Sequence, residues 1–454
     1  MATEQTAGTV GVAGGSRVRL RRLCERPDGD GWVIGRIETG DFITVPEVAH
    51  RIIALLGEGR AVDDVAAILR AETGTSFGVA DFVAALDELG FVAMVDELAR
   101  PDKAPLRASL PWLRPAHVRW LMHPLAPVMV AGFAVAAVVV LALHPALLPS
   151  YRVLVWSKHA GIVLAVNAAI AWTLILVHEL AHLATARAAG VPARITLSTR
   201  LQFLTAQTDV SGVWAATRRT RMTVYLAGMS ADICAAGIFL IVLWLGDPHG
   251  LASHLLAVAA AEALLGLLIQ FLVFMRTDIY FVFQDITRCA NLYADGSAYL
   301  RYLFGRVTRP VRHADDPDPS EEYQLPQRRA IRLYSAVLLG GTAICLGVEF
   351  AVSLPALITL VARAVSETGT TLTGTLDGGA ALAVLLGFQI LWVSRWWHRH
   401  GHQVRSITRR QPRTGEEVEG HARHPRGRTR PAHGNSQGQG QGHAADRHPQ
   451  TRPA

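Results

Sequence analysis

Apolar residues are distributed differently in two parts of this chain. Before residue 100 they recur at the short periods of small strands and helices, whereas between residues 125 and 393 they form long uncharged runs. A run of about 20 apolar residues matches a membrane-spanning helix, because the helix rises about 1.5 Å per residue and the hydrocarbon core is about 30 Å thick. The pattern therefore predicts a small water-exposed domain followed by a domain that crosses a membrane.

Six apolar runs are candidate spans, at about residues 125–143, 160–182, 222–245, 251–275, 333–354 and 380–393. Because six is an even number, both termini should lie on one side, and the polar N-terminus without a signal peptide places that side in the cytosol. We predict a mainly α, polytopic protein of the cell membrane with about six transmembrane helices and a small N-terminal α+β, winged-helix-like cytosolic domain.

The distribution of charge agrees with this topology. Segments predicted to be external, about 144–159, 246–250 and 362–379, contain only Arg152, Lys158 and Arg363 as basic residues, and the cytosolic segments hold most of the arginines. This is the positive-inside rule. The second span enters from outside and reaches His178 after about 18 residues, or roughly 27 Å. His178 is therefore expected near the cytosolic face.

The N-terminal pattern predicts a folded domain at residues 17–97, after a disordered stretch at 1–16. Short β-type runs at 18–20, 32–34 and 42–44 precede three helices, and 91–94 is expected to return as a strand. The predicted apolar faces of the helices comprise Val48, Ile52 and Leu55, then Val62, Val65 and Leu69, then Val79, Phe82, Val83 and Leu86.

The remaining boundaries follow from composition. Residues 98–124 are rich in proline and arginine and are predicted to be a basic linker at the membrane surface. Residues 125–394 form the predicted membrane domain. Residues 395–454 are rich in Arg, His, Gly and Gln with few apolar residues, which predicts a disordered basic tail.

Composition supports membrane insertion and argues against nucleic acid as a partner. Half of the 454 residues are apolar and the mean hydropathy is +0.26. The formal net charge of +7 comes almost entirely from arginine, which accompanies abundant alanine and glycine as in proteins of GC-rich genomes. The third predicted helix carries Asp81, Asp87 and Glu88 and would repel phosphate. The four cysteines show no C-x-x-C spacing, so neither a disulfide framework nor a cysteine zinc site is indicated.

The second span ends in His178-Glu179-Leu180-Ala181-His182, an H-E-x-x-H pattern. On a helix, residues four apart share a face, so both imidazoles can bind one metal ion, and Glu179 lies close enough to accept a proton from an activated water. Two histidines, a third ligand and an open position are typical of catalytic Zn²⁺. Two histidines on a buried helix can also lack any ligand, but polar groups in a membrane segment usually mark function.

Two aspartates are candidates for the third ligand, because each follows the fourth span at the cytosolic end. Asp278 fits best, and Asp285, one to two turns further on, is the alternative. Asp278 could instead be a helix-end carboxylate paired with Arg276. Asp232, inside the third span, could orient a ligand or be buried in its protonated form. Glu262 and Glu349 are further intramembrane carboxylates to which we assign no role.

The membrane domain resembles the site-2-protease (M50) family of membrane zinc metallopeptidases, in its peptide zinc metalloprotease branch. The motifs that carry the resemblance are H-E-L-A-H at 178–182, A-R-A-A-G at 186–190, M-R-T-D at 275–278, Q-D-I-T at 284–287 and N-L at 291–292. The resemblance implies that His178, His182 and Asp278 bind zinc and that Glu179 is the general base. The family often has Asn-Pro before the aspartate and Gly after it, whereas this chain has Leu272-Val273 and Ile279.

The N-terminal domain resembles the PqqD-like peptide-recognition domains. Three strands precede three helices, with Glu38-Thr39-Gly40-Asp41-Phe42-Ile43-Thr44-Val45-Pro46 at the junction. In that family the leader of a ribosomally made peptide adds as a strand to the sheet edge. A purely structural cap is the alternative.

These patterns together predict a membrane zinc metallopeptidase that binds and cleaves a peptide, the leader of a ribosomally synthesised, modified peptide. The expected partners are this peptide substrate and the lipid bilayer. Two alternatives stay open: an intramembrane protease that cleaves a membrane-anchored signalling protein, and a non-hydrolytic peptide-binding or export partner.

Overall fold

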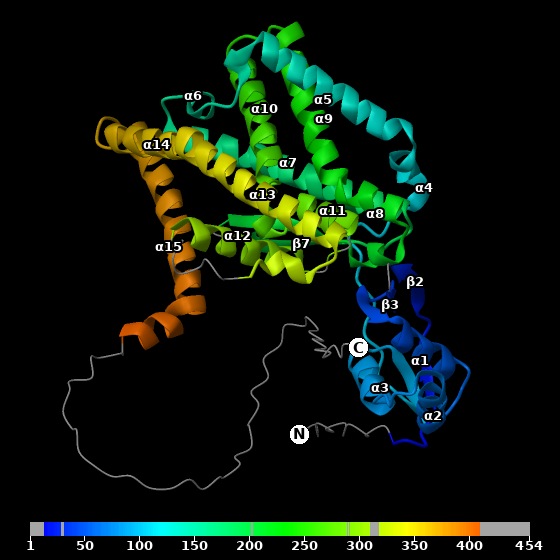
Figure 1. Ribbon diagram of the computed structural model, residues 1–454. Helices are drawn as coiled ribbons and strands as arrows, with labels where there is room; N and C mark the ends of the chain where they lie inside the picture. The colour runs from blue at the N-terminus through cyan, green and yellow to red at the C-terminus, as the bar shows by residue number, and fades with distance from the viewer. Residues whose placement is uncertain are drawn as a thin grey trace, which may run out of the picture. The chain divides into compact units, whose positions relative to one another are not determined.

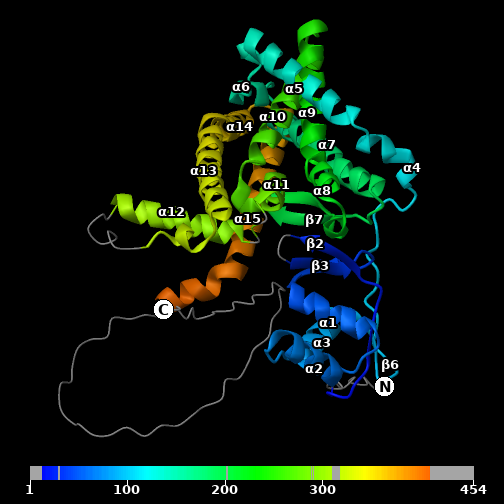
Figure 2. The ribbon, with the colours of Figure 1, turned by 45° about the vertical axis from the view of Figure 1, so that its right-hand side comes forward.

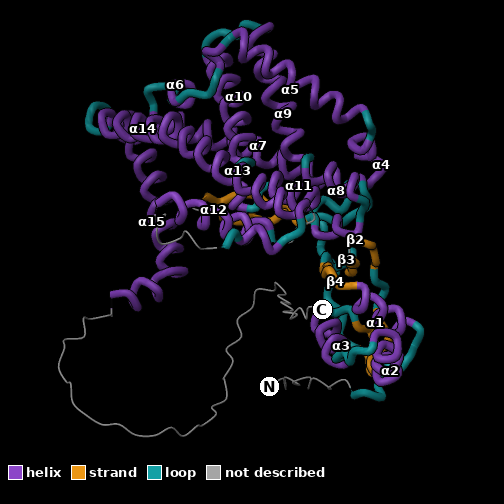
Figure 3. The backbone as a smooth tube through the Cα atoms, in the orientation of Figure 1, coloured by secondary structure: helices purple, strands orange, loops and turns teal. Residues whose placement is uncertain are grey.

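The computed structural model describes residues 13–28, 31–200, 203–287, 289, 291–308 and 317–408. The chain divides into two compact units, residues 1–394 and 395–454, and the candidate site described below belongs to the first. Within the described residues the protein is mainly helical, and strands occur only in the N-terminal domain and in one later hairpin (Figures 1 and 3).

The N-terminal domain contains two small antiparallel sheets and three helices around one apolar core. One sheet has the order β2-β3-β4 and the other β1-β5-β6. Ile34, Val65, Val83 and Leu86 are fully buried in the shared core. The elements are β1 (Val18–Leu20), β2 (Cys24–Asp28), β3 (Gly31–Arg36), β4 (Asp41–Pro46), α1 (Glu47–Gly57), α2 (Val62–Thr73), α3 (Val79–Glu88), β5 (Val92–Val95) and β6 (Leu98–Ala99).

The three predicted N-terminal strands, the returning strand and the three helices are present, but β2 and β6 were not predicted. β2 contains Pro27 and charged residues, which is tolerated because it is an end strand that, among the described strands, pairs with β3 alone. β6 pairs with β5 and lies inside the predicted linker. At the other boundary, residues 1–12 lie outside the described part, whereas Ser16 is buried and its carbonyl accepts a hydrogen bond from the Val62 amide. The prediction of disorder is therefore wrong for residues 13–16.

Six helical segments in the described chain are long and apolar enough to cross a membrane, as predicted. The fifth is longer than expected because α13 continues through a π-helical turn, η6, into α14. The segments comprise α5 (Leu125–Leu143), α7 (Ala160–Ala188), α9 (Ala227–Leu245), α10 (Leu251–Ile269), α13 (Leu325–Val348) with η6 (Glu349–Ser353) and α14 (Leu354–Glu367), and the part Leu372–Ile390 of α15 (Leu372–Thr408).

Three predicted boundaries are wrong. The third span begins at Ala227, because Arg218–Tyr225 forms a separate polar helix, α8. The fourth ends at Ile269, and the chain turns through η4 (Val273–Met275) before α11 (Asp278–Thr287). Helix α15 continues to Thr408, although disorder was predicted from residue 395, because adding residues to an existing helix costs little. Residues 409–454 of the predicted tail lie outside the described part.

An antiparallel hairpin that the sequence did not predict follows the second span. Its strands are β7 (Arg194–Arg200) and β8 (Phe203–Asp209), and β8 packs against α7 (Figure 2). The short helix η3 (Ser211–Ala215) comes next and contacts β3 and β4 of the N-terminal domain. The other short elements are α4 (Pro115–Val118), η1 (Arg119–Met122), η2 (Pro145–Leu147), α6 (Tyr151–Leu154), α12 (Leu292–Thr308) and η5 (Pro319–Glu322).

Candidate metal site

The two histidines of the H-E-x-x-H pattern lie side by side on α7. The Nε2 atoms of His178 and His182 are 3.2 Å apart, and both residues are buried, with exposed fractions of 8% and 6%. Their rings meet edge to face. The helical spacing of four residues therefore brings both potential ligand atoms to one point.

Asp278, the first residue of α11, completes a group of three. Its Oδ2 lies 3.0 Å from Nε2 of His178 and 3.1 Å from Nε2 of His182. Tetrahedral zinc with bonds of about 2.0–2.1 Å separates its ligand atoms by about 3.3 Å. Burial alone would raise the pKa of Asp278, but the two imidazoles outweigh it and hold this pKa well below its usual range. His178, His182 and Asp278 could thus hold a metal ion.

The turn between α10 and α11 brings Asp278 to the histidines. Arg276 adopts a left-handed backbone conformation, with φ +53°. The buried Thr277 hydroxyl then donates to the carbonyl of Gln270 at 2.5 Å, and the Asp278 amide donates to the Gln270 side chain at 3.2 Å. Ile279 lies within α11 and is buried, so this chain needs no glycine after the aspartate.

Helix α9 can approach both imidazoles closely because residue 228 has no side chain. A Cβ built on Gly228 of α9 would lie 2.5 Å from Cδ2 of His178 and even closer to Nε2 of both histidines. Real Cβ atoms do not approach neighbours closer than 3.0 Å. The close approach of α9 therefore depends on glycine at position 228, and the nitrogen and oxygen donors of the three residues fit a bound zinc ion.

Both imidazoles are oriented by hydrogen bonds at their other nitrogen. Nδ1 of His178 lies 2.7 Å from Oδ2 of Asp232, and Nδ1 of His182 donates to the Val224 carbonyl at 2.8 Å. With the proton on Nδ1, Nε2 keeps its lone pair, which is the form that binds a metal. Asp232 thus orients a candidate ligand, one of the two roles considered from the sequence.

Glu179 points to the hairpin. Its Oε2 accepts hydrogen bonds from the amide and the hydroxyl of Thr208 on β8, both at 2.7 Å. The side chain is partly exposed. Glu179 is therefore held next to the two histidines by an element that the sequence did not predict.

Asp285, the alternative third ligand, is engaged elsewhere. Its Oδ1 accepts from Nε of Arg221 at 3.0 Å and also from Nη2 of the same guanidinium. Arg221 is 2% exposed. Asp285 is therefore not among the residues that could hold a metal with the two histidines, because α11 turns it toward α8. Glu262 lies within α10 and Glu349 begins η6, and neither belongs to this group.

Sequence reasoning missed Gly228, Gln270, Val224 and Thr208. Of these, only Gly228 left a signal, as a glycine four residues before the intramembrane Asp232. Val224 acts through its backbone carbonyl, and Gln270 and Thr208 act through turns and strands that the apolar pattern does not reveal.

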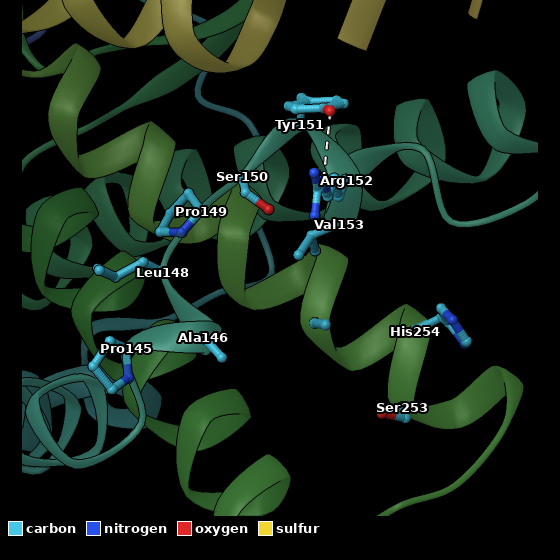
Figure 4. Close-up of a pocket in the computed structure, with 11 residues that line it drawn as sticks. Pro145, Ala146, Leu148, Pro149, Ser150, Tyr151, Arg152, Val153, Ser253 and His254 are labelled. Carbon is cyan, nitrogen blue, oxygen red and sulfur yellow. Dashed lines mark hydrogen bonds between the residues drawn. The ribbon is translucent and has the colours of Figure 1, made fainter. Parts of the chain in front are cut away.

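Two other features lie apart from these residues. His159, Glu367 and Asp377 form a second group of potential ligands, but Asp377 already accepts from the amides of Gly161 and Ile162 at the start of α7. A cavity of about 690 Å³ is lined by residues of 145–153 and 253–257, where Arg152 donates to the Tyr151 hydroxyl (Figure 4). Neither feature includes His178, His182 or Asp278.

Comparison with models of protein families, with curated proteins and with solved structures finds no match to this chain.

Proposed function

We propose that the protein is a membrane-embedded zinc metallopeptidase that binds and cleaves a peptide. The observation that carries the proposal is the convergence of Nε2 of His178, Nε2 of His182 and Oδ2 of Asp278 within 3.2 Å of one another, with Glu179 adjacent in the chain. The fixed Nδ1 partners add support.

Zinc held by these residues would supply a Lewis acid that polarises the scissile carbonyl and activates water near neutral pH. Glu179 takes the proton from the attacking water and returns it to the leaving amine. Its described hydrogen bonds all go to Oε2, which leaves Oε1 to exchange the proton. Asp232 and the Val224 carbonyl keep both imidazoles in the metal-binding tautomer.

The substrate class rests on the N-terminal domain. Strand β4 stands at the end of its sheet and pairs with β3 alone among the described strands, so an extended peptide can add to its other edge. Strands β3 and β4 also contact η3, which directly follows the hairpin that holds Glu179. An unfolded leader of a ribosomally synthesised, modified peptide suits the free edge of β4, because its extended backbone can pair there. It also suits a peptidase site, because cleavage needs an exposed backbone. In this proposal the protein spans the cell membrane with both termini in the cytosol.

The test combines metal content with turnover. Detergent-purified wild type should hold about one zinc per chain, and the variants His178→Ala and Asp278→Asn should lose it. Glu179→Gln should keep zinc and peptide binding but lose cleavage. His254→Ala, a histidine outside the group, is the matched control and should behave as wild type.

Each outcome separates the proposed function from an alternative. If the wild type binds no zinc even after zinc is supplied, the peptidase proposal is wrong and the non-hydrolytic peptide-binding or export role is retained. Unchanged turnover in Glu179→Gln would show that Glu179 is not the general base. Cleavage of a helical membrane-anchored protein, with no cleavage of extended peptides, would favour the intramembrane signalling protease.

A further inference from the structure

Thr208 presents two hydrogen-bond donors to one oxygen of Glu179. Its amide and its hydroxyl each lie 2.7 Å from Oε2, and the residue is partly buried. The hydroxyl is also 3.0 Å from the backbone carbonyl of Glu179. Since a hydroxyl carries one proton, it donates to one of these oxygens at a time, and the shorter contact is with the charged carboxylate.

The hairpin makes this arrangement possible. Thr208 pairs with Ile195 of β7 on one side, and β8 faces α7 on the other. On that outer edge the Thr208 amide has no strand to bond, and it donates to the Glu179 side chain instead. The hairpin end is fixed in turn, because Oδ1 of Asp209 accepts from the Ser211 amide at 3.0 Å and from its hydroxyl at 2.6 Å.

We propose that Thr208 is a positioning residue for Glu179, an inference that rests on the proposed peptidase function. A glutamate side chain has three rotatable bonds, so a carboxylate without partners samples many orientations. Two donors on Oε2 fix the carboxyl group and direct Oε1 to the place where the proton is exchanged. Thr208 touches neither substrate nor metal in this role, and it acts only through Glu179.

A purely structural role would make different predictions. If Thr208 merely attached the hairpin to α7, loss of its hydroxyl would lower stability and leave turnover per folded molecule unchanged. Thr205 on the same strand provides the matched control, because its hydroxyl contacts only the neighbouring Ala206 carbonyl, at 3.1 Å, among the described bonds.

The experiment uses the full-length, zinc-loaded protein and a leader-type peptide substrate. Thr208→Val keeps the shape and the backbone amide but removes the hydroxyl, and we expect kcat to fall by about 10- to 100-fold with KM and zinc content unchanged. Thr208→Ser should restore most of kcat, and Thr205→Val should match wild type. Wild-type kcat in Thr208→Val, or no recovery in Thr208→Ser, would overturn the proposal.

A second measurement does not depend on turnover or metal. Hydrogen exchange of the Thr208 amide in zinc-free protein should accelerate in Glu179→Ala, which removes the acceptor, and stay slow in Glu179→Gln, which keeps an acceptor oxygen. Unchanged exchange in Glu179→Ala would show that the contact is absent. If zinc-loaded wild type cleaves no peptide, the proposed function is refuted and this inference with it. If wild type is active and Thr208→Val is equally active, the inference alone is refuted.

Discussion

Replacing Gly228 by alanine tests the candidate metal site most sharply, because the change adds a single methyl group. Its Cβ would lie 2.5 Å from Cδ2 of His178, whereas carbon atoms in contact are about 3.5–4.0 Å apart. The imidazole, or helix α9, must therefore move by about 1 Å. Such a displacement separates the three donor atoms that now lie within 3.2 Å of one another.

The expected effect is a loss of zinc affinity of at least about 100-fold, since changes to groups that only orient metal ligands already cost about 10- to 100-fold. Competition with a chromophoric chelator, on detergent-purified protein, measures this affinity. Gly266→Ala on α10 is the matched control, because a Cβ there meets nothing within 4 Å, and it should bind zinc as wild type does. Wild-type affinity in a folded Gly228→Ala variant would refute the reasoning that the candidate metal site requires glycine at position 228.

Three other outcomes follow from the described contacts. Asp232→Ala removes the partner of His178 Nδ1 and should weaken zinc binding by about 10- to 100-fold in the same competition assay, without changing peptide binding. Asp285→Ala leaves the charge of the buried Arg221 uncompensated and should lower the free energy of unfolding by about 3–5 kcal/mol, which is measured as a lower melting temperature. The folded fraction of this variant should bind zinc as wild type does. Loss of zinc binding would instead show that Asp285 is a ligand. Burial and the neighbouring Asp295 raise the pKa of Tyr323 to about 12, because both favour the neutral phenol in the folded protein. The stabilisation that this neutral phenol gives the folded state is therefore full below pH 10 and is lost as the pH rises toward 12. Tyrosinate absorbance should show this titration at lower pH in Asp295→Asn, and an unmoved titration would contradict the assignment.

Local patterns made part of this structure predictable. In a membrane, an apolar run of spanning length must satisfy its own backbone hydrogen bonds and so forms a helix, and the six long apolar helices of the described chain could be predicted on that ground. The proximity of His178 and His182 is likewise local, since it depends only on the helical repeat. Asp278 was selected because topology placed it at the same depth as His178.

The features that escaped prediction depend on contacts between distant segments. Strand β2 contains a proline and charges and is held by its pairing with β3, so its sequence alone resembles a turn. The hairpin of β7 and β8 carries a mixed polar pattern and is stabilised by pairing and by α7. The break at Gln270–Arg276 follows an apolar run that could have continued as helix, and the bonds of Gln270 to Thr277 and Asp278 fix the turn.

The separation of the site residues along the chain has a consequence for biosynthesis. His178 and His182 leave the ribosome well before Asp278, and helices α9 and α10 are made in between. A nascent chain that ends before α11 contains two histidines without the aspartate, and one that ends before α9 also lacks Gly228 and Asp232. The full group of candidate ligands can therefore come together only after the first four of the six candidate spans have been made. The order of synthesis itself thus keeps the candidate metal site incomplete until α11 has been made.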